Sequence, residues 1–116
     1  MLNGEVDMTD YLQVASTTSS QEEAVRLARG ITEARLAACV QIAGPIRSIY
    51  WWVGKVQDAE EWHLVIKTTS DALSALESYI KANHSYEVPE IIATPIIGGS
   101  AEYLAWVSAE TTPDRS

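Results

Sequence analysis

Residues 36–69 have the sequence LAACVQIAGPIRSIYWWVGKVQDAEEWHLVIKTT, which is long and rich in β-branched and aromatic residues. These residue types favour extended structure, so we expect one strand over 36–56, with a bulge or bend at Gly44-Pro45. The polar run 57–60 predicts the turn, and a second strand should continue to Thr69. One face of that second strand should carry Trp62, Leu64 and Ile66, and the other Glu61, His63, Val65 and Lys67.

Three consecutive aromatic residues, Tyr50, Trp51 and Trp52, lie toward the end of the first strand. Because neighbouring residues of a strand point to opposite faces, this triplet makes both faces aromatic. One interpretation is a strand buried on both faces within a single chain. We favour contact with another subunit, since Trp and Tyr are enriched at interfaces and large exposed apolar patches are rare on monomers.

The segments before and after this hairpin alternate between strand and helix patterns. Residues 11–15 are a short strand candidate, and Ser20 with Glu23 matches a capping box. Apolar residues recur at helical spacing after that box, so a helix should cover 21–35. A second helix should begin near Ser70, with a core face made of Leu73, Leu76 and Ile80.

A strand over 91–97 and a short helix or strand over 101–109 complete the chain. The order is β-α-β-β-α-β plus a C-terminal element, which predicts an α+β, ferredoxin-like split βαβ sandwich with a long hairpin. Two helices cover only one face of such a sheet, so the other face again predicts a partner. We expect a single domain over 9–111, with 1–8 and 112–116 as loose termini.

Composition narrows the range of partners. The 116 residues carry a formal net charge of −8, which argues against nucleic acid because phosphate binding needs clustered Lys and Arg. No apolar run approaches the roughly 20 residues of a membrane span, and the N-terminus does not have the pattern of a signal peptide. The single cysteine cannot form an intramolecular disulfide, which fits a reducing compartment. We expect a soluble cytoplasmic protein.

Five blocks of sequence resemble the CutA divalent-cation tolerance family, in that family's order and spacing. The resemblance implies a ferredoxin-like homotrimer, similar in shape to the PII signalling proteins, in which long hairpins pair across subunits. It also implies a role in tolerance of copper and other divalent metals. The blocks are LAACVQI (36–42), SIYWWVGK (48–55), Glu61 with Lys67-Thr68, HSYEVPE (84–90) and YLAW (103–106).

The same resemblance implies where copper ligands would lie. Family members described as copper-binding use a cysteine after the first strand and a His-His pair, and the corresponding residues here are Ser16, Asn83 and His84. One histidine does not make a transition-metal site, so we interpret His84 as a hydrogen-bonded loop residue and only a weak metal candidate. Cys39, in an apolar segment, is expected to pack as a small buried hydrophobe and is a second weak candidate. His63 is weaker still.

A second group of residues predicts a ligand-binding cleft between subunits. Lys67 ends its strand, while Tyr86 and Glu90 lie just before the next strand, so we expect them to converge beside Trp52, with Glu61 on the same strand as Lys67. A lysine, a tyrosine and a carboxylate would suit a small anionic ligand or acid–base work. The alternative is a set of salt bridges and hydrogen bonds that lock the trimer.

Three classes of function therefore stay open. The first is a divalent-cation tolerance protein that binds Cu(II) or another divalent cation weakly. The second is a PII-like trimeric sensor of a small ligand, and the third is an enzyme of unknown substrate. The sequence holds no nucleophile elbow, phosphate loop or CxxC motif, so we do not expect a defined enzyme or an obligatory cofactor.

Overall fold

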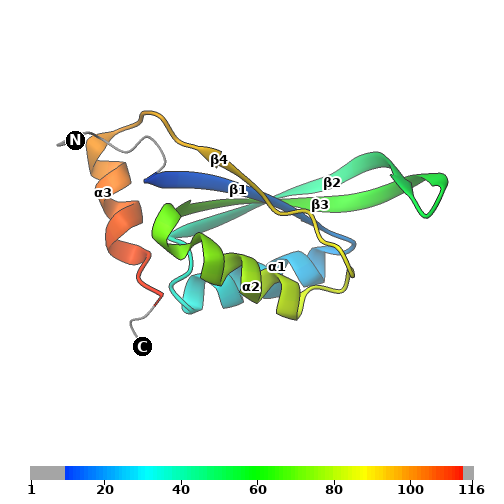
Figure 1. Ribbon diagram of the computed structural model, residues 1–116, viewed down its shortest axis with the longest axis horizontal. Helices are drawn as coiled ribbons and strands as arrows, with labels where there is room; N and C mark the ends of the chain where they lie inside the picture. The colour runs from blue at the N-terminus through cyan, green and yellow to red at the C-terminus, as the bar shows by residue number, and fades with distance from the viewer. Residues whose placement is uncertain (1–9, 114–116) are drawn as a thin grey trace.

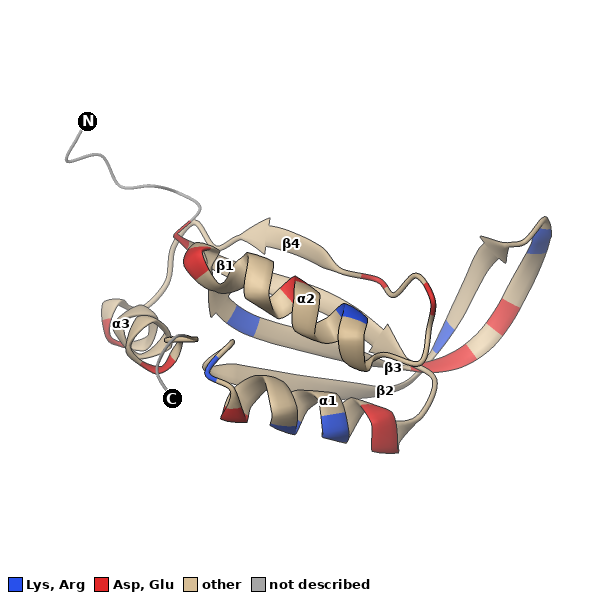
Figure 2. Ribbon diagram, turned by 60° about the horizontal axis from the view of Figure 1, so that its bottom comes forward, with Lys and Arg blue, Asp and Glu red and all other residues tan. Residues whose placement is uncertain are grey.

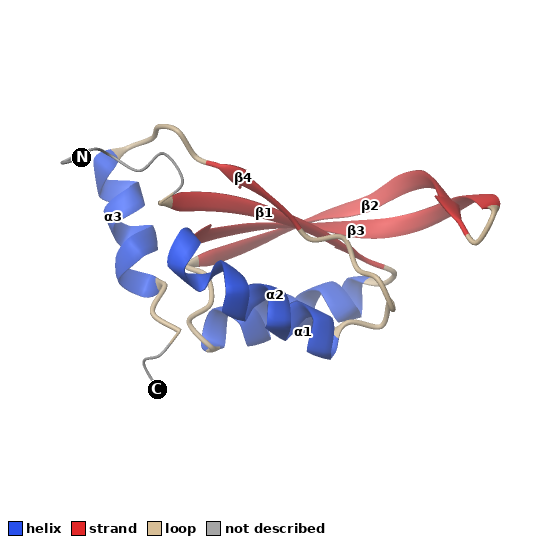
Figure 3. Ribbon diagram, viewed as in Figure 1, coloured by secondary structure: helices blue, strands red, loops and turns tan. Residues whose placement is uncertain are grey.

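The structure is a computed structural model that describes residues 10–113, and its order of elements confirms the predicted ferredoxin-like α+β fold (Figures 1 and 3). Within these residues one antiparallel sheet has the strand order β2-β3-β1-β4. The expected loose segment 1–8 and residues 114–116 lie outside the described residues. The elements are β1 (Tyr11–Thr18), α1 (Gln21–Glu33), β2 (Cys39–Trp52), β3 (Lys55–Thr69), the 3-10 turn η1 (Ser70–Ala72), α2 (Leu73–Asn83), β4 (Ile92–Pro95) and α3 (Ala101–Glu110).

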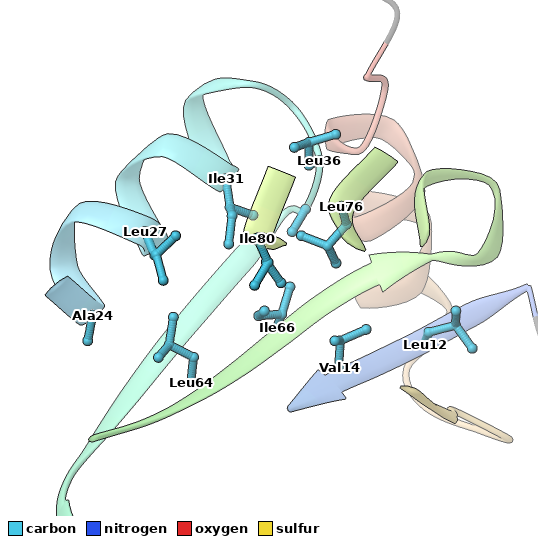
Figure 4. Packing of buried hydrophobic residues seen from close by; sticks show 11 residues of the cluster. Leu12, Val14, Ala24, Leu27, Ile31, Leu36, Leu64, Ile66, Leu76 and Ile80 are labelled. Carbon is cyan, nitrogen blue, oxygen red and sulfur yellow. The ribbon is translucent and has the colours of Figure 1, made fainter. Parts of the chain in front are cut away.

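The core lies between the sheet and the helices α1 and α2, which both cover one face of it (Figures 1 and 4). The strand alternation predicted for β3 is confirmed there, since Leu64 and Ile66 are fully buried. Val14 of β1 lies directly opposite Ile66 in the register and is buried with it. The helices contribute Ala24, Leu27, Ile31, Leu76 and Ile80.

Strands β2 and β3 form a hairpin that projects beyond the helices (Figures 1 and 3). The predicted turn over 57–60 is wrong, because β3 begins at Lys55 and the turn is Val53-Gly54. Both turn residues have positive φ angles of 50° and 74°, as a two-residue type I′ turn requires. The bulge predicted at Gly44-Pro45 is confirmed by a register shift between Ala43 and Ile46.

Several predicted boundaries need correction. The first strand continues past Ala15 to Thr18, because Thr17 and Thr18 pair with β3 rather than forming a loop. The final strand is only Ile92–Pro95, and the C-terminal element left open between helix and strand is the helix α3. Ser100 caps it by accepting a hydrogen bond from the Tyr103 N–H.

Helix α1 begins as predicted, since the Ser20 hydroxyl accepts a hydrogen bond from the Glu23 N–H. The helix ends at Glu33, two residues before the predicted end. Thr112 and Pro113, expected to be loose, are half-buried. Within residues 10–113 the helices are too short and too polar to cross a membrane.

Candidate functional site

The loop between α2 and β4 is held against the sheet by the imidazole of His84, whose side chain is fully buried. Its Nε2 lies 2.7 Å from the carbonyl oxygen of Thr17, and its Nδ1 accepts a hydrogen bond of 2.9 Å from the Tyr86 N–H. A carbonyl can only accept, so the neutral ring carries its proton on Nε2 and donates it to Thr17. Both ring nitrogens are therefore occupied within the chain.

Glu23 of α1 provides a second anchor for the same loop. Its carboxylate accepts hydrogen bonds from the N–H of Ser85 at 2.8 Å and from the hydroxyl of Ser85 at 2.9 Å. Burial by itself raises the pKa of Glu23, but the two hydrogen bonds from Ser85 and the nearby positive charge of Arg26 lower it below its ordinary value. Glu23 is therefore a charged anchor, and the capping-box glutamate reaches the loop instead of its own helix start.

The third anchor joins the loop to the hairpin. The Tyr86 hydroxyl donates a short hydrogen bond of 2.6 Å to Oε2 of Glu61 on β3. Burial, together with this bond and the negative charge of Glu61, raises the pKa of Tyr86. The hydroxyl therefore keeps its proton and acts as a donor, which makes it unsuited to act as a general base. Glu61 is only 5% exposed, although it lies on the sheet face that the helices do not cover.

A pocket of about 710 Å³ opens between this loop and the hairpin. Four of the five residues predicted for the ligand cleft line it together: Trp52, Glu61, Tyr86 and Glu90. Figure 2 colours the acidic residues of the loop and of β3 red, and three of these, Glu61, Glu87 and Glu90, line the pocket. The remaining lining residues are Thr17, Ser48, Ile49, Tyr50, Glu87, Val88 and Pro89.

Within one chain the structure does not bring Lys67 to this pocket, and the predicted approach of Lys67 from a neighbouring subunit stays a prediction. Lys67 lies opposite Cys39 and Gln13 in the sheet register, and its ammonium donates a 2.7 Å hydrogen bond to the Gln41 side chain. Tyr86 reaches Glu61 instead, because its neighbours His84 and Ser85 are held at Thr17 of β1 and Glu23 of α1. The walls that one chain contributes to this pocket therefore lack the lysine that an anionic ligand would need.

The residues at the expected copper positions do not fit a metal centre within the described part of the chain. His84 has no free ring nitrogen, and Ser16 is 1% exposed on the helix-covered side of β1. The Asn83 side chain donates to the Tyr79 carbonyl oxygen. No group of three or more His, Cys, Asp or Glu side chains that could hold a metal ion occurs within residues 10–113.

The other two metal candidates lie apart from this region. Cys39 is half-buried instead of fully buried, and it contacts Tyr103 of α3. Burial raises the pKa of Tyr103, and the neighbouring Cys39 adds to that increase. His63 lies opposite Thr17 and Ala43 in the sheet. Neither residue lines the pocket, so each is best described as a structural contact within this chain.

Sequence reasoning missed the contact between Tyr86 and Glu61 and the contribution of Tyr50. A signal for Tyr50 was present, because strand alternation places Tyr50 and Trp52 on the same side of β2. For Glu61 the only signal in the sequence was the position of a carboxylate on the face of β3 that the helices do not cover. Its burial depends on a loop that follows more than twenty residues later.

Comparisons with known proteins agree with this fold. Residues 12–110 match the family model described as CutA1 divalent ion tolerance protein. The chain is 50% identical to the chloroplastic protein CutA 1 of Oryza sativa over 82% of its own length and 54% of that protein. It is 45% identical to the divalent-cation tolerance protein CutA of Thermus thermophilus, over 84% of the chain and 95% of the relative. The plant relatives from rice and Arabidopsis thaliana are thus matched over about half their length, 54% and 52%.

Solved structures show the same likeness. The crystal structure of CutA1 from Oryza sativa superposes with a TM-score of 0.87 and 46% identity, covering 91% of this chain and 98% of that one. The CutA1 structure from Thermus thermophilus has a TM-score of 0.86 and 43% identity, covering 88% and 99%.

Proposed function

Because this chain belongs to the CutA1 divalent ion tolerance protein family, we propose that it acts in divalent-cation tolerance. Its Thermus and Archaeoglobus relatives carry that function in their names. The proposal concerns a response to metal ions and does not require this chain to hold copper on His84. Both nitrogens of that ring are engaged in hydrogen bonds that keep the loop in place.

We further propose that the pocket beside Tyr86 and Glu61 is the site through which the protein acts. The observation that supports this is the 2.6 Å hydrogen bond between these residues, which couples the loop to the hairpin at the pocket wall. A ligand that contacts both elements can change how the hairpin is held, and this is the property a sensor needs. We favour this PII-like role over catalysis, because the raised pKa of Tyr86 removes it as a general base.

The functional unit in this proposal is a homotrimer. The hairpin carries large apolar side chains that the described part of the chain leaves open: Ile49, Trp51, Val53 and Val56 are 65%, 73%, 84% and 56% exposed. A continuous apolar surface of this kind is characteristic of subunit interfaces. We therefore propose that hairpins of neighbouring copies cover one another and close the pocket from its open side.

Complementation tests the tolerance role. A bacterial strain lacking its own CutA protein would be grown in increasing Cu(II), Zn(II) and Co(II), with and without this chain. We expect the wild type to restore growth and Glu61→Gln to fail at equal protein levels. No effect of the wild type on any metal would overturn the tolerance role, whereas full rescue by Glu61→Gln would overturn the role of the pocket.

Direct metal binding is tested separately by calorimetry of the purified protein with Cu(II). We expect no binding tighter than about micromolar, because soft divalent metals need several thiolate or imidazole ligands in one place. His84→Ala should leave any weak binding unchanged while lowering thermal stability. A nanomolar affinity that disappears in His84→Ala would show that the loop histidine is a ligand after all.

A further inference from the structure

The charge of Glu61 has no cationic partner within the described chain. Only Oε2 of its carboxylate has a hydrogen-bond partner among residues 10–113, and that partner is the neutral Tyr86 hydroxyl. The side chain is nevertheless 5% exposed, and it lines the pocket. Its second oxygen, Oε1, has no partner in the described chain and is not sealed from the pocket, so it can accept a hydrogen bond from a cationic group there.

The residues that line the pocket also favour a cation. Among the described residues that line it there is no lysine, arginine or histidine, while three are glutamates: Glu61, Glu87 and Glu90. Three others are the aromatic residues Tyr50, Trp52 and Tyr86, and the remaining walls include Ile49, Val88 and Pro89. The electron-rich faces of Trp and Tyr attract ammonium groups, and the apolar walls can pack against methylene groups. Among the walls that one chain contributes, an anionic ligand would find no positive side chain.

A bare metal ion suits these walls less well than an organic cation. Divalent ions need several oxygen, nitrogen or sulfur ligands around one point, and no such group of three occurs within the described residues. An alkylammonium needs only one acceptor for its N–H groups and a surface for its carbon chain. Oε1 of Glu61 is that acceptor, and the aromatic side chains provide that surface.

The two remaining carboxylates favour a second positive charge on the ligand. Glu87 and Glu90 are exposed, whereas Glu61 is buried, so the pocket has one negative group inside and two near its mouth. We propose that the pocket binds a protonated aliphatic diamine or polyamine, with one ammonium on Glu61 and a second near Glu87 and Glu90. Its volume of about 710 Å³ lies in the range of small-molecule sites. This inference rests on the proposed function, because it names the ligand class of the same pocket.

Calorimetry with four probes of similar length tests the proposal on the assembled protein. They are 1,4-diaminobutane with two positive charges, butylamine with one, 1,4-butanediol with none and succinate with two negative charges. We expect affinity to fall in that order, with about tenfold between the diamine and butylamine at low salt and no heat from the diol or succinate. Equal affinity for all four probes, or binding of succinate alone, would overturn it.

Variants then locate the binding. Glu61→Gln should weaken the diamine at least about tenfold, because the amide can still accept the Tyr86 hydrogen bond but carries no charge. The double variant Glu87→Gln/Glu90→Gln should bind the diamine and butylamine with equal affinity. Glu60→Gln is the matched control, since Glu60 is the exposed neighbour on β3 and does not line the pocket. Equal weakening by Glu60→Gln and Glu61→Gln would show only non-specific attraction to an acidic protein.

Light scattering of Glu61→Gln distinguishes a failure of the amine proposal from a failure of the proposed trimer or of the proposed metal-tolerance role. If the amines do not bind and Glu61→Gln dissociates the oligomer, a cation from a neighbouring subunit pairs with Glu61, and the amine proposal is wrong while the trimer stands. If the amines do not bind but Glu61→Gln still loses metal tolerance in cells, the pocket is functional with a different ligand. Amine binding without any metal-tolerance phenotype would instead reject the proposed function and keep the ligand class.

Discussion

The helix-covered half of the sheet and the projecting hairpin contain similar residues but have opposite surroundings. In the first half, Leu64 and Ile66 are fully buried beneath α1 and α2. In the hairpin, Trp51 on β2 and Val53 in the turn are 73% and 84% exposed. Figure 1 shows why, because the hairpin extends past the ends of both helices.

This difference indicates two separate roles for apolar residues in one sheet. The covered half stabilises the fold of the single chain. The hairpin contributes little to that fold, so its apolar and aromatic residues are available for other copies of the chain and for the pocket. The pocket lies where the two halves meet, with Glu61 and Tyr86 holding the loop against the base of the hairpin.

The largest expected effect is in the covered half. Leu64→Ala should lower the free energy of unfolding by about 3 kcal/mol, since it removes a fully buried side chain and leaves a cavity. Urea denaturation measures this change. Val56→Ala in the hairpin is the matched truncation. It should change the free energy of unfolding of the single chain by less than about 0.5 kcal/mol. Similar losses for both variants would mean that the hairpin is as integral to the single chain as the core.

The next effect concerns assembly. Trp51→Glu should raise the dissociation constant of the oligomer at least about 100-fold, which is about 2.7 kcal/mol, because it would place an unpaired charge in an apolar contact. Light scattering across a dilution series measures it, with the wild type near three times the 12.7 kDa chain mass.

Val25→Glu on α1 is the control for that experiment. Val25 is 40% exposed on a helix that covers the opposite side of the sheet. The same apolar-to-acidic change there should leave the oligomer intact. A wild type that scatters as a 12.7 kDa monomer at micromolar concentration would contradict the trimer outright.

A smaller effect is expected at the anchor of the loop. Glu23→Gln should lower the free energy of unfolding by about 2 kcal/mol at pH 7, because the carboxylate accepts two hydrogen bonds from Ser85. The pKa of Glu23 in the folded protein is below its ordinary value of 4.5. Its contribution is therefore present above pH 4.5 and is lost as the pH falls through the folded pKa.

The pH series supplies the check on Glu23. Urea midpoints of the wild type and Glu23→Gln should differ most at pH 7 and approach each other toward pH 3. Glu22→Gln, at the exposed neighbouring residue, should stay within about 0.5 kcal/mol of the wild type. A difference that grows on acidification would mean that the pKa of Glu23 is raised and not lowered.

The smallest expected effect is a gain at the tip of the hairpin. Val53 is a β-branched residue at a φ of 50°, a conformation that asparagine tolerates better, and Asn-Gly is a favoured pair in this turn. Val53→Asn should stabilise the chain by about 0.5–1 kcal/mol in thermal unfolding. Val56→Asn, three positions further along the chain on β3, should not stabilise the chain. A loss in Val53→Asn would indicate that Val53 has a role in contacts between subunits.

Local patterns in the sequence predicted the secondary structure correctly where local chemistry is decisive. Ser20 marks the start of α1 because its hydroxyl caps the first turn, and Trp62, Leu64 and Ile66 mark the covered face of β3 by strict alternation. The motifs from residue 36 to 106 also identified the family, which the comparisons confirm. The turn was misplaced because polar residues usually indicate loops, whereas the polar start of β3 belongs to a hairpin that projects into solvent.

Which side chains line the pocket depends on contacts between distant parts of the chain. Glu61 and Tyr86 are 25 residues apart, and their contact depends on how the loop after α2 packs against β1, α1 and β3. The same loop uses both nitrogens of His84, as expected for a hydrogen-bonded loop histidine, while Lys67 contacts Gln41, so the pocket of one chain is acidic and aromatic. Local patterns fix which face a residue takes on its own strand. They do not fix which distant loop covers that face, because that depends on the packing of the whole chain.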